Sequence, residues 1–184
     1  MDPVFLYENM KAVNAMLYDL HEGSKPVITE VDGWAAGGGF SLALASDITV
    51  ATDRAKFVMS YIRVSIAPDL GASYFLTRRV GLAVAKELAF TGRVVESEEA
   101  LRIGLVNMVL PPDRVSEEVM RLAGRIARRS PKALSITKQY LNIAQVTNPR
   151  TLMDLEAANQ PFLVMSPEHK RDVERFIKKM GDGD

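Results

Sequence analysis

The chain of 184 residues is 47% hydrophobic and 25% charged, which is the composition of a globular domain with a buried core. Its 23 basic and 23 acidic residues cancel, which argues against nucleic acid or an anionic membrane surface as a partner. The absence of cysteine excludes disulfides and thiolate metal sites, and two isolated histidines argue against a zinc site.

The first predicted element is a helix over residues 2–22, where apolar residues recur at spacings of three and four. No signal peptide precedes this helix, and no apolar run approaches the roughly 20 residues that span a bilayer. Strands are expected near 26–31, 47–52 and 56–59, with helices elsewhere. We therefore expect a cytoplasmic α/β protein with no membrane partner.

The carboxyl-terminal third is predicted to be helical throughout. Ser130-Pro131, Asn148-Pro149 and Ser166-Pro167 each place a capping residue before a proline that suits the first helical position. Gly104 indicates the end of an earlier helix.

Residues 32–47 contain the strongest chemical signal. Three consecutive glycines, Gly37, Gly38 and Gly39, follow a strand and open a helix rich in alanine and leucine. Glycine lacks a Cβ atom, so the backbone can approach a ligand closely. The free N–H groups at a helix start also form a positive end that suits an oxyanion or a phosphate. This turn is predicted to bind negative charge.

Several known motifs compete for this turn. A dinucleotide fingerprint needs glycine where Leu42 stands, and a Walker phosphate loop needs a Lys-Ser or Lys-Thr pair that is absent. A nucleophile elbow is nearly met by residues 39–43, which makes Ser41 a candidate nucleophile. Its base would have to be His21 or His169, and neither has an evident catalytic context. A serine hydrolase therefore stays open, beside the interpretation of Ser41 as an ordinary helix residue.

An ordered set of motifs continues without a gap beyond the glycine turn. It comprises Val31–Gly39 with Ser46–Ile48, Ala55–Phe57, Ile66–Gly81, Leu88–Gly92 and Ala100–Val106. From about Lys25 to Lys179 the chain resembles the crotonase superfamily of enoyl-CoA hydratases and isomerases. The resemblance implies a crotonase-like (ClpP/crotonase) α/β fold with a truncated β-β-α spiral core over residues 1–125. It also implies a helical oligomerisation region over residues 126–184, in a homotrimer or a dimer of trimers.

The resemblance further implies an acyl-CoA substrate, in which coenzyme A is part of the substrate, with no permanently bound cofactor and no metal. Family hydratases carry two catalytic glutamates at the positions of Ser41 and Tyr61, and neither residue is acidic here. Asp69 matches the carboxylate of family members that shift a double bond. Gly38 matches the glycine whose N–H binds the thioester oxyanion. We therefore expect isomerisation through an enolate with Asp69 as the single base, although aspartate is also an ordinary helix N-cap.

Other positions of the family motifs are expected to contact the substrate, namely Gly37, Gly39, Trp34, Ser41, Tyr61 and Lys179. Lys179 matches a lysine that reaches the CoA phosphates, with a solvated surface lysine as the alternative. A plain core tyrosine is the alternative for Tyr61.

The family's long amino-terminal region of strands, with the loop that donates the other oxyanion N–H, has no counterpart, because only 36 residues precede Gly37. Three further interpretations therefore stay open beside isomerisation. The chain is a catalytically weak or inactive fragment that serves oligomerisation or CoA binding, a hydratase-type lyase with non-standard residues, or a serine hydrolase that uses Ser41.

Overall fold

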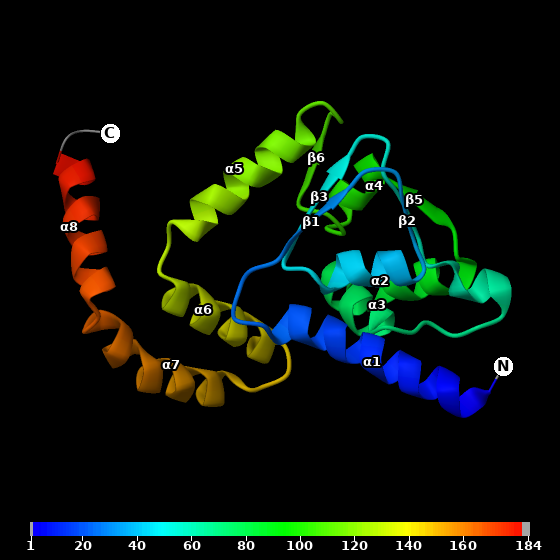
Figure 1. Ribbon diagram of the computed structural model, residues 1–184, viewed down its shortest axis with the longest axis horizontal. Helices are drawn as coiled ribbons and strands as arrows, with labels where there is room; N and C mark the ends of the chain where they lie inside the picture. The colour runs from blue at the N-terminus through cyan, green and yellow to red at the C-terminus, as the bar shows by residue number, and fades with distance from the viewer. Residues whose placement is uncertain (1, 182–184) are drawn as a thin grey trace. The chain divides into compact units, whose positions relative to one another are not determined.

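A computed structural model describes residues 2–181 of the chain, with only the backbone described for Lys179. The chain forms two compact units, Met1–Ile126 and Ala127–Asp184. The first unit combines strands with helices, and the second is helical in its described part (Figure 1).

The secondary structure of the first unit alternates between short strands and helices. Its helices are α1 (Pro3–Glu22), α2 (Gly38–Ala45), the 3-10 helix η1 (Ser60–Val64), α3 (Ala72–Thr91), α4 (Ser97–Arg102) and α5 (Val115–Ala127). Its strands are β1 (Ile28–Val31), β2 (Trp34–Ala36), β3 (Ile48–Thr52), β4 (Lys56–Val58), β5 (Val94–Glu96) and β6 (Met108–Leu110).

These strands form two three-stranded sheets. In one sheet β3 lies between β1 and β6 and runs parallel to both, with Ile28 of β1 opposite Ile48 of β3. In the other sheet β4 lies between β2, which is parallel, and β5, which is antiparallel. Only Asp32 and Gly33 separate β1 from β2, so the chain crosses from one sheet to the other just before the glycine turn.

Helix α2 lies in the core of the first unit. Its residues are apolar on nearly all sides, which is the pattern of a buried helix. It contacts α1, β2 and α3, and the rings of Phe40 and Phe57 pack with their centroids 5.8 Å apart. Tight packing on several sides fixes both ends of this short helix, including the end formed by the glycines.

Most of the predicted elements are confirmed, including the first helix and the three predicted strands. The expectation of helices elsewhere was wrong for β2, β5 and β6. Each of these strands has only three residues, which is too short to show an alternating pattern, and each is stabilised by pairing with a distant strand.

The start of α3 also differs from the prediction. The helix begins at Ala72 with Gly71 as its N-cap, so Asp69 lies before the helix and does not cap it. Leu70 and Gly71 have φ angles of 52° and 72°, in the left-handed region, which delays the start of the helix. Such a conformation is common for glycine and unfavourable for leucine.

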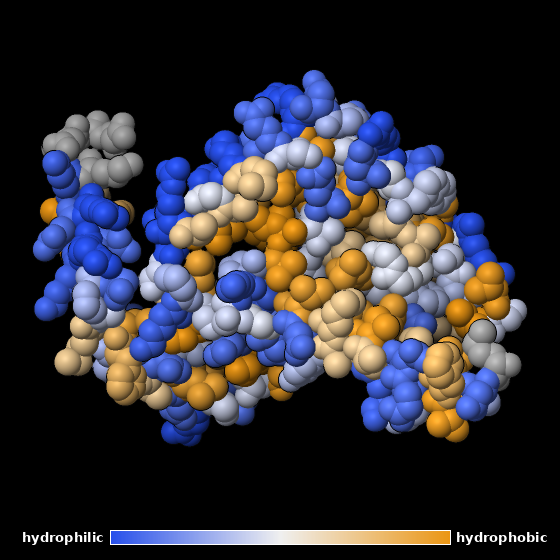
Figure 2. Space-filling view, viewed as in Figure 1, coloured by the Kyte–Doolittle hydropathy of each residue, from blue (hydrophilic) through white to orange (hydrophobic). Residues whose placement is uncertain are grey.

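The second unit contains α6 (Pro131–Ala144), α7 (Pro149–Val164) and α8 (Pro167–Gly181). The predicted caps are confirmed, because the side chains of Ser130, Asn148 and Ser166 each accept a hydrogen bond from the third following backbone N–H. Hydrophilic side chains predominate along α8 on the face shown in Figure 2. Among residues 2–181, no helix is both long and apolar enough to cross a membrane.

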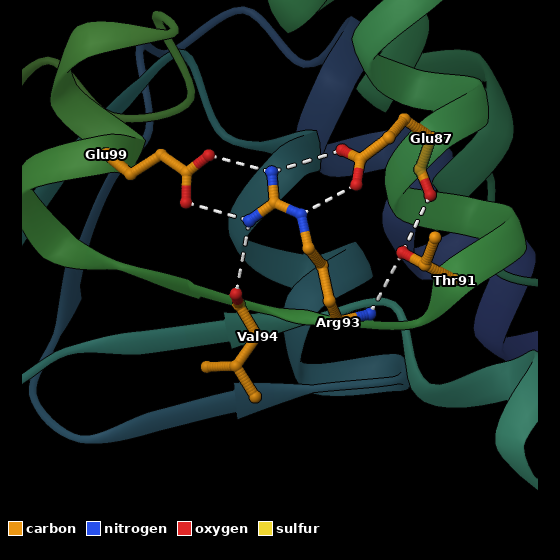
Figure 3. A network of polar contacts seen from close by, with 5 residues as sticks. All are labelled: Glu87, Thr91, Arg93, Val94 and Glu99. Atoms are coloured by element: carbon orange, nitrogen blue, oxygen red, sulfur yellow. Dashed lines mark hydrogen bonds and ion pairs between the residues drawn. The ribbon is translucent and has the colours of Figure 1, made fainter.

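An arginine between two carboxylates ties α3 to the segment that follows it (Figure 3). The guanidinium of Arg93 donates to Glu87 at 2.7 and 3.1 Å and to Glu99 at 2.7 and 2.8 Å. These hydrogen bonds raise the pKa of Arg93, and those with Glu99 have the largest effect. In turn, the hydrogen bonds from Arg93 lower the pKa of Glu99. Because the Arg93 side chain is 38% exposed, we expect the network to orient α4 more than it stabilises the fold.

Candidate active site

The glycine turn places backbone N–H donors at the start of α2. Gly37 has φ 49° and ψ −119°, and its N–H donates to the carbonyl of Val58 at 3.2 Å. The carbonyl of Gly37 accepts the first helical hydrogen bond, from Ser41 N–H at 3.0 Å. Gly38 and Gly39 therefore occupy the first turn of α2, where N–H groups have no acceptor within the helix. The structure thus places Gly38 at the helix start, and its role as a donor to an anion stays a prediction.

Replacing Gly37 by alanine should destabilise the protein by about 1–3 kcal/mol, because its backbone angles are closed to residues with a side chain. Gly39→Ala is the matched control, since a Cβ atom there meets no other atom within 4 Å. Alanine is favoured in a helix, so this control should be as stable as the wild type or more stable. Urea unfolding measures both changes, and equal stabilities of the two variants would contradict the assigned geometry.

Asp69 is anchored by its backbone, and one of its two carboxylate oxygens has no hydrogen-bond partner among the described residues. Its carbonyl accepts hydrogen bonds from Ala72 N–H at 2.9 Å and from the Ser41 hydroxyl at 3.5 Å. Its side-chain Oδ1 is buried and accepts no hydrogen bond from any residue that the structure describes. A buried carboxylate oxygen without a partner is unfavourable, and such groups occur where a site is shaped for chemistry.

Ser41 and Tyr61 form a buried hydroxyl pair beside Asp69. Their oxygens are 2.9 Å apart, and the two residues are 0% and 5% exposed. Burial raises the pKa of Tyr61 to about 12, with a further increase from Asp69 and an opposing effect of the hydrogen bond with Ser41. The phenol is therefore protonated at neutral pH, so that it donates a hydrogen bond and does not act as a base.

In the serine hydrolase alternative, Ser41 is the nucleophile and needs a histidine base beside its hydroxyl. Besides Tyr61, its hydroxyl bonds the carbonyl oxygens of Gly37 at 3.3 Å and of Asp69. None of these partners, in the described part of the chain, is a histidine. The imidazole of His21 instead packs edge-on against Phe75, with ring centroids 5.0 Å apart.

Comparison with known proteins decides the family. The sequence profile of the enoyl-CoA hydratase/isomerase family matches residues 7–181. The chain belongs to this family.

This crotonase resembles relatives that are named for both reactions. It is 43% identical over 152 residues to a short-chain-enoyl-CoA hydratase of Clostridioides difficile, covering 83% of this chain and 97% of the relative. It is 30% identical over 167 residues to a trans-2-decenoyl-[acyl-carrier-protein] isomerase of Streptococcus mutans, covering 91% of this chain and 64% of the relative.

Solved structures confirm the crotonase fold. The crystal structure of an enoyl-CoA hydratase/isomerase from Cupriavidus metallidurans CH34 matches with a TM-score of 0.91 at 37% identity. The match covers 97% of this chain and 67% of that one. The chain thus spans about two thirds of the length of this relative. Its own carboxyl-terminal region is helical.

Trp34 and Lys179, two further positions of the crotonase motifs, are placed differently from Ser41 and Tyr61. The side chain of Trp34 is 65% exposed, and Lys56 Nζ lies 5.6 Å from its ring centroid. Lys179 belongs to α8, but its side chain lies outside the described part of the structure. The structure therefore brings Gly38, Ser41, Tyr61 and Asp69 into one region, whereas the Trp34 side chain is largely exposed.

Sequence reasoning missed Leu70, which packs beside the glycine turn. A Cβ atom at Gly38 would lie 3.1 Å from Leu70 Cδ1, so this side chain lies against Gly38. The only signal in the sequence is the adjacency of Leu70 to Asp69, because nothing in a leucine predicts a left-handed φ angle.

A charged network holds the segment that precedes the glycine turn in this crotonase. Arg54 donates to both carboxylate oxygens of Asp32 at 2.5 Å, and Thr52 Oγ1 donates to Oδ1 at 2.9 Å. These hydrogen bonds, chiefly those of Arg54, lower the pKa of Asp32 from 3.8 to about 2. The network connects β3 to the crossing between the two sheets.

The depressed pKa of Asp32 predicts acid sensitivity. A carboxylate with a lowered pKa contributes stability that is present above its unfolded pKa and lost as the pH falls through the folded one. For Asp32 this window lies between about pH 4 and pH 2. We expect the urea midpoint of the wild type to fall more steeply across that window than that of Asp32→Asn. The exposed substitution Asp113→Asn should keep the wild-type slope, and parallel curves for Asp32→Asn and wild type would contradict the assignment.

Proposed function

We propose that this member of the enoyl-CoA hydratase/isomerase family is a double-bond isomerase of enoyl-CoA thioesters. Asp69 removes a proton from C2 of a 3-enoyl thioester, and the electron pair moves onto the thioester oxygen to give a dienolate. The N–H of Gly38 stabilises this oxyanion. The protonated Asp69 then returns the proton to C4, the double bond moves to C2–C3, and the carboxylate is regenerated. No atom is gained or lost overall.

The observation that supports this function best is the free buried oxygen of the Asp69 carboxylate. A single base that carries one proton between two carbons needs a carboxylate oxygen that can accept this proton, and Asp69 Oδ1 has no hydrogen-bond partner among the described residues. The backbone carbonyl of Asp69 accepts hydrogen bonds from Ser41 of α2 and from Ala72 of α3. These bonds hold the Asp69 side chain beside the glycine turn.

Hydration is the second candidate, because the 43% identical relative is named a hydratase. Addition of water to an enoyl thioester uses one group to activate water and another to protonate carbon. The two residues at the family glutamate positions are hydroxyls bonded to each other, and the pKa of Tyr61 of about 12 keeps it protonated. This pair supplies no second carboxylate, which favours isomerisation.

The substrate and assembly follow from the same proposal. Coenzyme A is part of the substrate, Gly37 and Gly39 shape the turn around the thioester, and Lys179 and Trp34 remain proposed contacts. A homotrimer or a dimer of trimers, assembled through the helical region 126–184, is the proposed oligomer. The protein is proposed to act in the cytoplasm.

The test supplies the purified chain with a 3-enoyl-CoA and separately with the matching 2-enoyl-CoA, and identifies the products by chromatography. We expect the 3-enoyl thioester to be converted to the 2-enoyl thioester without formation of a 3-hydroxyacyl product. Hydration of the 2-enoyl thioester at a rate equal to isomerisation would favour the second candidate. Inertness toward both substrates would contradict the proposal.

A further inference from the structure

A cavity of about 440 Å³ lies between α1 and the start of α3, inside the first unit. It is lined by Asn14, Leu17, Tyr18, His21, Glu22, Leu70, Gly71, Tyr74 and Phe75. Sites for small ligands are commonly 300–1,000 Å³ and are mostly apolar, with a few polar groups. The cavity is therefore large enough for part of a substrate, and the function proposed above assigns no group to it.

One wall of this cavity is built from aromatic rings. The rings of Tyr74 and Phe75 meet edge to face with centroids 5.3 Å apart. His21 approaches both of them, at 5.0 Å from Phe75 and 5.9 Å from Tyr74. Edge-to-face clusters favour another flat ring, which gains contact energy beyond the burial of its area.

The cavity adjoins the proposed reaction centre through Leu70. This residue directly follows Asp69 in the chain, and its side chain both lines the cavity and lies against Gly38. A thioester oxygen bound at Gly38, with its reacting carbons at Asp69, would therefore have Leu70 beside it. The cavity is thus adjacent to the proposed reaction centre and has room for the part of the acyl group beyond the reacting carbons.

We infer that the cavity between α1 and α3 binds the tail of the acyl group and selects an uncharged tail that carries a ring. This inference rests on the proposed function, because it places the thioester at Gly38. An engineered cavity of about 150 Å³ holds benzene, and this one is about three times as large, so that a ring with its connecting carbons fits.

The charge at the edge of the cavity restricts the tail further. Glu22 lines the cavity, and its carboxylate lies 3.4 Å from His21 Nε2. A tail that ends in a second carboxylate would meet the carboxylate of Glu22 and would lose its hydration. A neutral ring avoids both penalties. The site is thus suited to an aryl-substituted acyl thioester rather than to a dicarboxylic one.

Binding of saturated thioesters tests this inference apart from catalysis. Titration calorimetry of the whole chain would compare acetyl-CoA with 4-phenylbutanoyl-CoA, neither of which has a double bond to move. Burial of the ring should make the phenyl compound bind about tenfold to a hundredfold more tightly.

Two variants locate the preference. Asn14→Trp fills the cavity from an exposed position of α1, and should reduce the preference for the phenyl compound to less than threefold while leaving acetyl-CoA binding unchanged. Ala15→Trp places the same side chain at the next position, which does not line the cavity, and should keep the preference.

Each outcome bears on the inference. Equal affinities of the wild type for the two thioesters, or an undiminished preference in Asn14→Trp, would overturn it and leave the proposed isomerase intact. Failure of the wild type to bind either thioester would overturn the proposed function together with the inference. A preference that is lost in Asn14→Trp and kept in Ala15→Trp supports it, even if the isomerase assay shows no turnover.

Discussion

Replacing Asp69 by asparagine should abolish double-bond migration, lowering kcat by about a hundredfold to ten-thousandfold, which is the usual contribution of a positioned general base. Asparagine keeps the shape of the side chain but cannot accept a proton from C2 of the thioester. The fold should survive, because the substitution leaves unchanged the backbone carbonyl of Asp69, which accepts hydrogen bonds from Ala72 and Ser41. The measurement is the rate of 2-enoyl-CoA formation from a 3-enoyl-CoA.

The control for this variant is Asp113→Asn, an exposed aspartate elsewhere in the first unit. It should turn over at the wild-type rate. Thermal unfolding of Asp69→Asn should match the wild type, since asparagine has nearly the same shape and the backbone hydrogen bonds of this residue are kept. An Asp69→Asn variant that isomerises at the wild-type rate would rule out Asp69 as the base.

Replacing Arg79 by methionine should destabilise the protein by about 2 kcal/mol, in the range for a lost charged hydrogen bond in a partly buried position. Arg79 extends from α3 and donates to the backbone carbonyls of Leu44, at 3.5 Å, and Ser46 at the end of α2. Burial lowers the pKa of Arg79, and the nearby Asp47 opposes this shift. Methionine fills similar space but leaves the two carbonyls without this donor.

The effect should extend to catalysis, because α2 carries Gly38 at its other end. A helix of eight residues that is anchored less firmly at its carboxyl end should hold the oxyanion donor less precisely. We expect kcat to fall while KM changes little, measured at a temperature where the variant is folded. Arg79→Lys should recover part of the stability.

The neighbouring arginine provides a matched control. Arg78 is exposed, and its guanidinium lies 3.4 Å from the ring centroid of Tyr74. Substitution of this exposed residue by methionine should lower stability by less than about 1 kcal/mol. Equal melting temperatures of Arg79→Met and Arg78→Met would contradict the role assigned to Arg79.

Local signals explain the parts of the fold that the sequence predicted well. The three glycines before an apolar helix, and the capping residues before proline at positions 130, 148 and 166, act over a few neighbouring residues. Their structural consequences could therefore be inferred without tertiary contacts. The resemblance to the crotonase motifs then supplied the fold, which the local patterns alone did not specify.

Contacts between distant residues explain what the sequence could not show. Ser41 and Tyr61 are twenty positions apart, and their hydrogen bond depends on the packing of both α2 and η1 against α3. The reach of Arg79 to α2 spans more than thirty positions. Leu70 has a left-handed φ angle that its residue type disfavours, so only tertiary structure reveals the turn that separates Asp69 from α3.

The central claim, that one carboxylate carries one proton between two carbons, is tested most directly with a 3-enoyl-CoA deuterated at C2. Nuclear magnetic resonance of the product formed in ordinary water locates the deuterium. If Asp69 acts alone through its buried Oδ1, part of the deuterium should appear at C4 of the 2-enoyl product in the earliest turnovers. A product that carries only solvent hydrogen at C4 from the first turnover would contradict the single-base account.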